Sequence, residues 1–375
     1  MSSFYQKILC KSYSLIENTF FKQSLRSPKP NTLLIVKVDS IGDYVLFRNF
    51  IQEIKNSDTY KNHRITLCGN SWWKDLAENL DASVIDNFIW IDYSKLNDCG
   101  YWFRLHKKIF FSRFETVIQS TFSRDRIGDD IVKYSAAKKK IGSEGDLVNL
   151  TALKKKENDE TYTRLIPSAG KYMFEFNRNK HFFEQVLNKK IAISKPSIAS
   201  VHQTETKIIF FPGAKDTFRR WSTGNFAALS KKLKSDFPAA TFVICGSAQD
   251  TPMAKEIIAL STVSFTDLTG KLSLMQLVAE LEQAKLVIAN DSGPFHIAVA
   301  LNKKVICISN GNNYSRFTPY PEEMKTQSIV IYPDQITARS EQERREQFCR
   351  EVKEIDINNI SVEQVYLQVK EMKFN

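Results

Sequence analysis

The turn near residue 290 has the residue types of an anion-binding site. The apolar run 286–289 ends in Asn290-Asp291-Ser292-Gly293, and Pro294 follows. Proline is tolerated in the first turn of a helix, because its missing N–H has no intrahelical partner there. The N–H groups of such a helix start, its positive dipole end and the Ser292 hydroxyl can hold a phosphate. Helix capping by Asp291 or Ser292 explains the same residues without a ligand.

A carboxylate that could act as a base follows the first apolar run of the chain. The strand expected at 33–38 leads into Asp39-Ser40-Ile41-Gly42-Asp43, which puts Asp43 at the start of a helix behind a glycine. A carboxylate in that position can accept a proton from an attacking hydroxyl. The alternative is that Asp43 only complements the helix dipole. Lys37, before this loop, and Gly42, within it, are predicted to contact the substrate.

A basic segment follows the apolar run 207–211. It reads PGAKDTFRRW over residues 212–221, with Lys215, Arg219 and Arg220 after a Pro-Gly turn. These three cations could neutralise a diphosphate leaving group. A basic surface loop is the alternative interpretation.

Three further residues follow the run TFVIC at 241–245. Gly246 and Ser247 come directly after it, and Asp250 lies within reach of a ribose hydroxyl if a nucleotide binds there. Helix capping would account for them as well. His296, one turn into the helix after Pro294, is predicted to contact the substrate, with a buried structural histidine as the alternative.

Several catalytic signatures are missing from the chain. It has no G-x-G-x-x-G, P-loop, H-E-x-x-H or G-x-S-x-G sequence, which disfavours dinucleotide, NTPase, zincin and hydrolase functions. It also has no Asp-x-Asp pair for a metal-bound diphosphate, so no metal is expected. The six cysteines form no C-x-x-C pair, which indicates neither a zinc site nor a disulfide framework, and reduced thiols are expected.

The elements that must position these residues alternate between strand and helix. This rhythm predicts an α/β fold with parallel sheets, in which ligands sit beyond the carboxyl ends of the strands. The expected strands are 33–38, 64–68, 88–91, 114–120, 207–211, 241–245, 286–290 and 305–309. The expected helices include 45–55, 226–237, 253–260, one opened by a Ser273/Gln276 capping box and a terminal one opened by a Ser361/Gln364 capping box.

A length of 375 residues suggests about two domains. The stretch 194–206 is rich in Pro, Ser and Thr and interrupts the alternation, as a linker would. We therefore predict two doubly wound, Rossmann-like domains. The predicted divisions are a basic amphipathic segment at 1–30, an N-terminal acceptor domain at 31–193, a linker at 194–206, a C-terminal nucleotide-sugar domain at 207–340 and a helical segment at 341–375.

The composition is that of a soluble globular protein, with 42% hydrophobic and 25% charged residues. No apolar run approaches the ~18 residues of a spanning helix, and no secretory signal is visible, so a cytoplasmic protein is expected. The net charge of +11 favours nucleic acid, anionic lipid or a phosphorylated substrate without choosing among them. A helix at 5–20 could lie on an anionic bilayer or pack on the protein.

Taken together, these segments resemble glycosyltransferase family 9, the lipopolysaccharide heptosyltransferase family. The similar stretches are VKVDSIGDYVLFRNFIQEIK, FFPGAKDTFRRWSTGNFAAL, FVICGSAQD and DLTGKLSLMQLVAELEQAKLVIANDSGPFHIAVAL, and the resemblance spans roughly residues 32 to 370. It implies the GT-B fold, in which two Rossmann-like domains face a central cleft.

The resemblance also implies roles for individual residues. Asp43 matches the general base, Arg219 stands where a lysine usually meets the diphosphate, and Asp291, Ser292 and Gly293 match the nucleotide-sugar site. The implied reaction is an inverting transfer that needs no metal, with ADP-heptose as donor. The implied acceptor is a lipid-linked inner-core saccharide, reached through peripheral contact with the cytoplasmic face of the inner membrane.

The chain departs from the family pattern at three places. Arg219 replaces lysine, Ser292 replaces threonine, and 310–313 replace a turn similar to F-G-P-T, so this loop could contact base or sugar. Two other functions stay open. A nucleotide-sugar epimerase could share the architecture and would need no acceptor. A nucleic-acid-binding protein would explain the charge, but the aromatic and basic cluster expected of it is not visible, so no nucleic-acid partner is expected.

Overall fold

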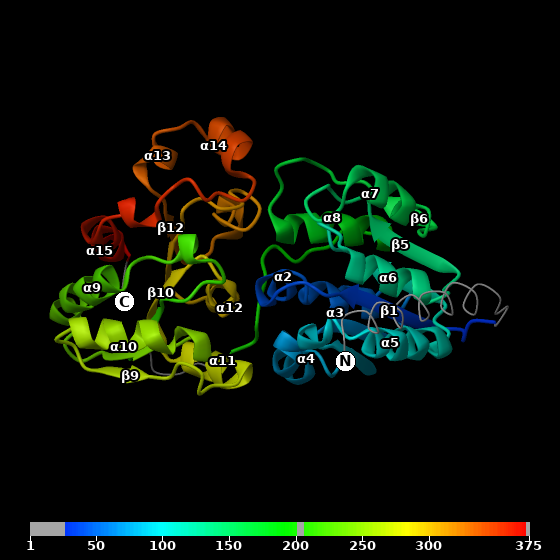
Figure 1. The fold of residues 1–375 in the computed structure, drawn as a ribbon, viewed down its shortest axis with the longest axis horizontal. Coiled ribbons are helices and arrows are strands. Elements are labelled where there is room, and N and C mark those ends of the chain that lie inside the picture. Colours follow the sequence, from blue (N-terminus) through cyan, green and yellow to red (C-terminus); the bar gives the residue numbers. More distant parts are fainter. Residues whose placement is uncertain (1–26, 201–205, 373–375) are drawn as a thin grey trace, which may run out of the picture. The chain divides into compact units, whose positions relative to one another are not determined.

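The computed structural model describes residues 27–200 and 206–372, which form two compact α/β units (Figure 1). The first unit holds the segment ending at Ser40 together with Phe47–Ala169 and Arg178–Ala192. The second holds Ile41–Leu46, Gly170–Asn177 and the segment beginning at Ile193. Each unit has its own six-stranded parallel sheet, so the predicted pair of Rossmann-like folds is confirmed. The helix expected at 5–20 lies outside the described residues.

The division by contacts differs from the boundaries expected from the sequence. Ile41–Leu46 and Gly170–Asn177 belong to the second unit, although the pattern placed both in the N-terminal domain. The loop that carries Asp43 therefore packs with the second unit, a property that hydrophobic periodicity cannot reveal.

The sheet of the first unit has the order β3-β2-β1-β4-β5-β6. The chain order reverses between β1 and β4, which makes their carboxyl ends a topological switch point. β1 is an unbroken buried run at Leu33–Val36, because helices cover both faces of a parallel sheet. The strands are β1 (Thr32–Lys37), β2 (Arg64–Asn70), β3 (Asn87–Ile91), β4 (Thr116–Gln119), β5 (Lys139–Ser143) and β6 (Arg164–Ile166).

The helices of the first unit bury apolar faces on this sheet. Ile109 of α5 and Ile131 of α6 belong to the same core cluster as Leu34 and Val36 of β1. The helices are α3 (Asn49–Lys55), α4 (Lys74–Leu80), α5 (Cys99–Ser112), α6 (Arg126–Tyr134), α7 (Ala152–Asp159) and α8 (Glu175–Leu187), whose first three residues belong to the second unit.

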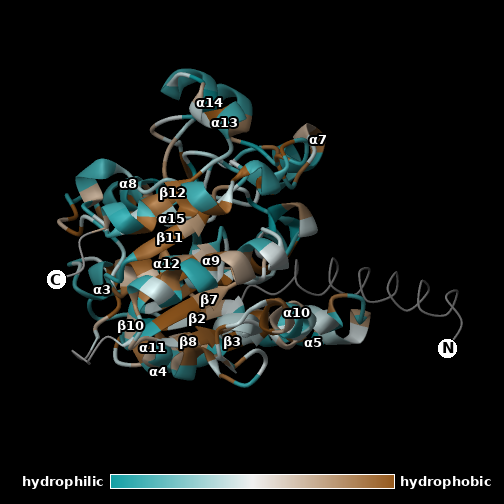
Figure 2. Cartoon of the chain, turned by 90° about the vertical axis from the view of Figure 1, so that its left-hand side faces the viewer, coloured by the Kyte–Doolittle hydropathy of each residue, from teal (hydrophilic) through white to brown (hydrophobic). Residues whose placement is uncertain are grey.

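The sheet of the second unit has the order β12-β11-β10-β7-β8-β9, with its switch point between β7 and β10. Figure 2 shows these two strands as hydrophobic and the surface helix α14 as hydrophilic. The strands are β7 (Lys207–Phe211), β8 (Thr241–Ile244), β9 (Phe265–Asp267), β10 (Ala284–Asn290), β11 (Val305–Ile308) and β12 (Ser328–Ile331). The helices are α2 (Ile41–Val45), α9 (Thr223–Asp236), α10 (Thr251–Leu260), α11 (Leu274–Glu282), α12 (Gly293–Ala300), α13 (Asp334–Thr337), α14 (Glu341–Phe348) and α15 (Val362–Glu371).

Most predicted elements of the second unit are confirmed. The Ser273/Gln276 capping box opens α11, and the Ser361/Gln364 box opens α15. The apolar face of α15, with Val365 and Val369, is buried in the core of the second unit.

The remaining differences concern short or mixed segments. The helix expected at 45–55 is two helices, α2 and α3, because Phe50 and Ile51 donate to the carbonyls three residues back, Phe47 and Arg48, where the α-helical hydrogen-bond pattern is interrupted. Strands β5, β6, β9 and β12 were not predicted, and three of them carry charged residues: β5 begins with two lysines, β6 begins with an arginine and β9 ends in an aspartate. Cys99 is disulfide-bonded, contrary to the expectation of reduced thiols, whereas Cys68, Cys245, Cys307 and Cys349 are free as expected. None of the helices in the described ranges is long and apolar enough to cross a membrane.

Candidate functional site

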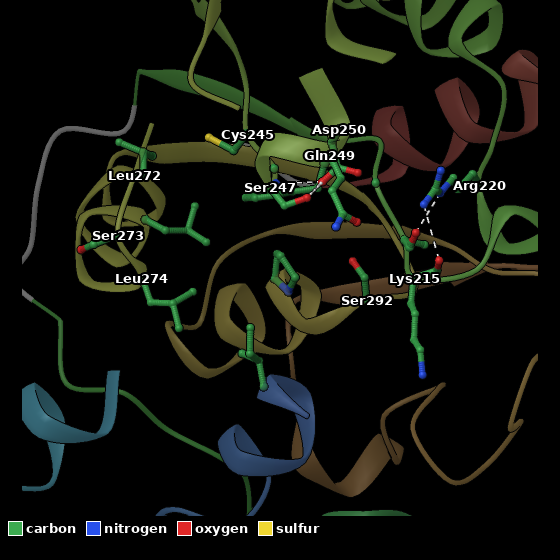
Figure 3. A pocket seen from close by; sticks show the side chains of 17 residues that line it. Lys215, Arg220, Cys245, Ser247, Gln249, Asp250, Leu272, Ser273, Leu274 and Ser292 are labelled. Atoms are coloured by element: carbon green, nitrogen blue, oxygen red, sulfur yellow. Dashed lines mark hydrogen bonds between the residues drawn. The ribbon is translucent and has the colours of Figure 1, made fainter. Parts of the chain in front are cut away.

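The second unit contains a pocket of about 420 Å³ beyond the carboxyl ends of β7, β8 and β10 (Figure 3). Parallel α/β sheets bind ligands at this edge, next to the switch point. Five of the predicted contact residues come together here from two loops: Lys215 and Arg220 after β7, and Gly246, Ser247 and Asp250 after β8. Ser292, a sixth predicted residue, lines the pocket from the loop after β10, and Ile41 reaches it from α2.

The two ends of the pocket differ in chemistry. Leu272, Leu274 and Cys245 lie at one end in Figure 3, and Lys215, Arg220 and Ser292 lie at the other. An apolar end suits a flat aromatic base, whereas cations and a hydroxyl suit a diphosphate. Burial raises the pKa of the Cys245 thiol to about 12, so this wall residue stays protonated at neutral pH.

Asn290, the last residue of β10, ties the two loops of the switch point together. Its Nδ2 donates to the carbonyl of Pro212 over 2.6 Å, and its Oδ1 accepts from the N–H of Trp221 at 3.2 Å. The side chain is fully buried. Asn290 thus fixes both ends of the basic segment 212–221 against β10.

The two adjacent arginines have different partners. Arg220 lines the pocket, and its Nε donates to the carbonyl of Ala214 over 2.7 Å. Arg219, in a 3₁₀ turn at Thr217–Arg219, instead pairs with Asp291 at 3.3 Å and also donates to the Asp291 carbonyl. The Arg219 Nε atom is buried and lacks a hydrogen-bond partner in the described part of the chain. Arg219 therefore retains one unused donor.

Asp291 is a buried counter-ion that does not line the pocket. Burial raises the pKa of its carboxyl, and the opposing effects of Arg219 and the Ser309 hydroxyl are smaller. Ser309 Oγ donates to Asp291 Oδ2 over 3.4 Å, and Arg219 lies by Oδ1. Both carboxylate oxygens are thus engaged by the protein.

Ser292 precedes α12 but does not cap it with its side chain. Its backbone is extended, and its hydroxyl donates to the carbonyl of Asn290 over 3.1 Å. Gly293 and Pro294 begin the helix, as the sequence predicts. The positive end of α12 therefore lies beside the polar end of the pocket without a side-chain cap from Ser292.

Asp250 combines capping with a position in the pocket wall. It accepts from the Ser247 N–H at 2.7 Å and from the Ser247 hydroxyl at 2.8 Å, which forms a capping box. A Cβ atom on Gly213 would lie 2.3 Å from the Asp250 carboxylate, and one on Gly246 would lie 2.9 Å away. Both glycines are needed because the carboxylate packs against their backbone.

Helix α2, which carries Asp43, packs against α12 inside the second unit. A Cβ atom on Gly42 would lie 2.8 Å from the His296 ring, and one on Gly293 would lie 3.2 Å from Ile41. Asp43 is half-buried and lies two residues along the chain from Ile41, which lines the pocket. The candidate base and the candidate anion site are therefore carried by two helices in contact.

His296 has a packing role in this contact. Its Nδ1 lies 2.9 Å from the Tyr320 hydroxyl, and its ring lies against Gly42. Burial, with a smaller contribution from Arg219, lowers its pKa to about 3, so the ring is neutral at physiological pH. It is absent from the pocket lining.

Lys37 lies in the first unit, in a buried ion pair that the sequence did not reveal. Its Nζ is 3.0 Å from Asp39 Oδ2, which also accepts from Thr121 Oγ1 at 3.1 Å. Lys37 is fully buried at the end of β1, and Thr121 follows β4 across the switch point. Asp39 Oδ1 is buried and lacks a hydrogen-bond partner in the described ranges. The sequence could have pointed to Asp39 as a site residue, because Asp39 directly follows an expected strand.

The loop at 310–313 makes other contacts than those expected. Asn310 Nδ2 donates to the carbonyl of Val352 over 2.8 Å, and Asn312 Oδ1 accepts from the Val352 N–H at 3.0 Å. These residues do not line the pocket. They brace the segment that follows α14, and the contact with base or sugar suggested by the sequence stays a prediction. Within the ranges that the structure describes, no three His, Cys, Asp or Glu residues group as metal ligands.

The comparisons with known proteins agree with this architecture. The model of glycosyltransferase family 9 (heptosyltransferase) matches residues 130–347, more than half of the chain. Of the solved structures, a family 9 glycosyltransferase from Veillonella parvula has a TM-score of 0.72 at 16% identity, covering 92% of this chain and 98% of that one. E. coli heptosyltransferase WaaC with ADP has a TM-score of 0.69 at 13% identity, covering 91% and 100%. The chain belongs to glycosyltransferase family 9 and has the two-domain fold of its heptosyltransferases.

The similarity in sequence to curated relatives is local. Lipopolysaccharide heptosyltransferase 2 of Escherichia coli K12 is 33% identical over 125 residues, or 32% of this chain and 35% of that protein. Lipopolysaccharide heptosyltransferase 1 of Campylobacter coli is 29% identical over 128 residues, or 33% and 35%. The matched region thus spans about a third of the length of these relatives.

Proposed function

We propose that this protein transfers heptose from ADP-heptose to a saccharide of lipopolysaccharide. Membership of family 9 supports the reaction class, and the named heptosyltransferases to which the chain is similar support the sugar. The observation that carries the proposal is the pocket of the second unit, which has an apolar end, a cationic end and a neighbouring helix with a carboxylate.

The donor would lie along the pocket with its adenine toward Leu272 and Leu274. Its diphosphate would then meet Lys215, Arg220 and the start of α12. Lysine and arginine supply charge-assisted hydrogen bonds to phosphate oxygens, and the helix dipole adds to them. Arg219, with its unused Nε donor, would complete the set.

Asp43 would act as the general base. It would take the proton from the acceptor hydroxyl while that oxygen bonds to the anomeric carbon and the bond from that carbon to the diphosphate breaks. Attack from the opposite side inverts the anomeric centre. Negative charge grows on the departing ADP, and the cationic end of the pocket would stabilise it in the role that a metal has in other transferases.

The acceptor would be a lipid-linked, phosphorylated saccharide at the cytoplasmic face of the inner membrane. The net charge of +11 supports contact with such an acidic surface.

Deletion of residues 1–28 tests the predicted contribution of the N-terminal segment to membrane binding. We expect weaker binding to anionic vesicles, and unchanged binding would contradict this part of the proposal.

The test of the reaction is a pair of incubations analysed by mass spectrometry. With ADP-heptose and a deacylated inner-core acceptor, we expect ADP and an acceptor heavier by one heptose. With donor alone, we expect the donor to be recovered unchanged. A rearranged sugar without acceptor would instead indicate an epimerase.

A thermal-shift series with ADP-, GDP-, UDP- and dTDP-sugars tests which nucleotide the donor carries, since a ligand that binds the folded state raises the apparent stability of the protein.

A further inference from the structure

The first unit has a cavity of its own at the amino edge of its sheet. The cavity measures about 270 Å³ and is bordered by the first residues of β1, β2 and β3 and by the last turn of α5. All strands of this sheet are parallel, so their amino ends share one edge. β1 has six residues, which puts this edge roughly 20 Å from the carboxyl ends of the strands. The cavity is therefore separate from the loops that follow the strands.

Three cations from different segments surround this cavity: Lys29, Arg64 and Lys108. All three side chains are exposed, and none forms an ion pair with a residue in the described ranges. The carbonyl end of α5 would itself favour one nearby cation, which Lys108 supplies. Lys29 and Arg64 then remain as positive charge that no nearby helix end explains.

The neighbouring carboxylates are committed to other partners. Glu115 accepts from the N–H of Asn31 at 2.7 Å and lies 4.0 Å from His63 Nε2. Asp86 accepts from the N–H of Ile65 at 2.8 Å. These contacts hold the amino ends of β1 and β2 in place, and they leave the three cations for a ligand.

The wall of the cavity is partly apolar. Ile89 and Phe114 are buried behind it, and Phe88 is half-buried at its border. The apolar wall offers a contact for the carbon part of a bound ester beside the three cations. An arginine fork beside two lysines matches the geometry and the charge of a phosphate group.

We propose that this cavity binds the phosphate group of a small anionic ester, at a site separate from the nucleotide pocket. The ester is either the headgroup of an anionic phospholipid or a soluble phosphate ester, and both present the same oxygens to Lys29, Arg64 and Lys108. This inference does not depend on the proposed transfer reaction.

The test compares two variants that lose the same charge. The site variant is Arg64→Gln with Lys108→Gln. The control is Lys231→Gln with Lys255→Gln, two exposed lysines of α9 and α10 that form no ion pair with a described residue. The full-length protein is used throughout. One assay measures co-sedimentation with phosphatidylcholine vesicles containing phosphatidylglycerol, and the other measures binding of glycerol 3-phosphate by titration calorimetry.

We expect the site variant to lose about fivefold in affinity for each cation removed, and the control to change less than twofold. A selective loss in the vesicle assay identifies a lipid headgroup, and a selective loss with glycerol 3-phosphate identifies a soluble ester. Equal losses in both variants would show that only the net charge matters and would overturn the proposal. The absence of binding by the parent protein in both assays would also overturn it. Thermal stability and ADP binding are measured for both variants as the control that they fold like the parent protein.

Discussion

Two strand ends, one in each unit, carry buried ion pairs that look alike but differ in their hydrogen bonding. At the end of β1, Lys37 pairs with Asp39, and at the end of β10, Asp291 pairs with Arg219. Both oxygens of Asp291 are engaged by protein donors, whereas Asp39 Oδ1 has no partner in the described residues. Lys37 is fully buried, but Arg219 is 19% exposed. The two pairs thus differ in the hydrogen-bonding atom that each leaves unused in the described residues, which is the Asp39 Oδ1 acceptor in the first unit and the Arg219 Nε donor in the second.

The largest effect should come from a carboxylate outside both pairs. Replacement of Asp43 by Asn removes the candidate base and should lower kcat by about 10² to 10⁴. The affinity for ADP should stay unchanged, because the nucleotide contacts lie on other loops. Rapid-quench turnover and ADP titration measure the two quantities. Normal turnover in a folded Asp43→Asn protein would remove Asp43 from the mechanism.

The ion pair of the first unit should be the more costly one to break. Asp39→Asn removes the carboxylate that lies 3.0 Å from the buried Lys37 ammonium, and we expect a loss of about 3 to 5 kcal/mol in the free energy of unfolding. Adding Lys37→Met to the Asp39→Asn variant should restore much of the lost stability. Asp291→Asn should cost less, because the partly exposed Arg219 can reach water. Urea denaturation of these three variants and the parent protein checks the order, and a larger loss for Asp291→Asn would reverse the comparison.

The contact between α2 and α12 should make stability depend on pH through His296. Its pKa is lowered from 6.5 to about 3, so below pH 6.5 the unfolded chain binds a proton that the folded chain excludes. The stabilising effect of the neutral ring is complete above pH 6.5 and is lost as the pH falls toward 3. Between pH 7 and pH 5 the loss should be about 2 kcal/mol. His296→Asn should lack this component in urea denaturation, and equal pH dependence in both proteins would contradict the assignment.

The smallest predicted effect concerns a matched pair of glycines. Gly213→Ala puts a methyl group 2.3 Å from the Asp250 carboxylate, so the pocket wall must shift, and we expect about tenfold weaker binding of ADP. Gly224→Ala meets nothing within 4 Å in the first turn of α9 and should stabilise the protein by up to about 1 kcal/mol. Calorimetry and thermal unfolding measure the two effects. Equal ADP affinity in both variants would show that Gly213 does not shape the pocket.

The sequence predicted the parts of the fold that depend on local pattern. β7, β10 and the start of α12 follow from apolar runs and from Pro294, and the capping boxes mark α11 and α15. The sequence pattern did not predict contacts between segments that are far apart in the chain. Nothing in periodicity shows that α2 packs with the second unit, that Arg219 pairs with Asp291 while its neighbour Arg220 lines the pocket, or that the 310–313 loop braces Val352. These contacts depend on tertiary packing between distant segments, which the pattern of a short stretch of sequence does not show.

A crystal structure of the protein with ADP tests the central claim most directly, because it shows where the nucleotide lies in the pocket of the second unit. We predict the adenine against Leu272 and Leu274 and the diphosphate within hydrogen-bond distance of Lys215, Arg220 or the start of α12. ADP bound in the opposite direction, or outside this pocket, would contradict it.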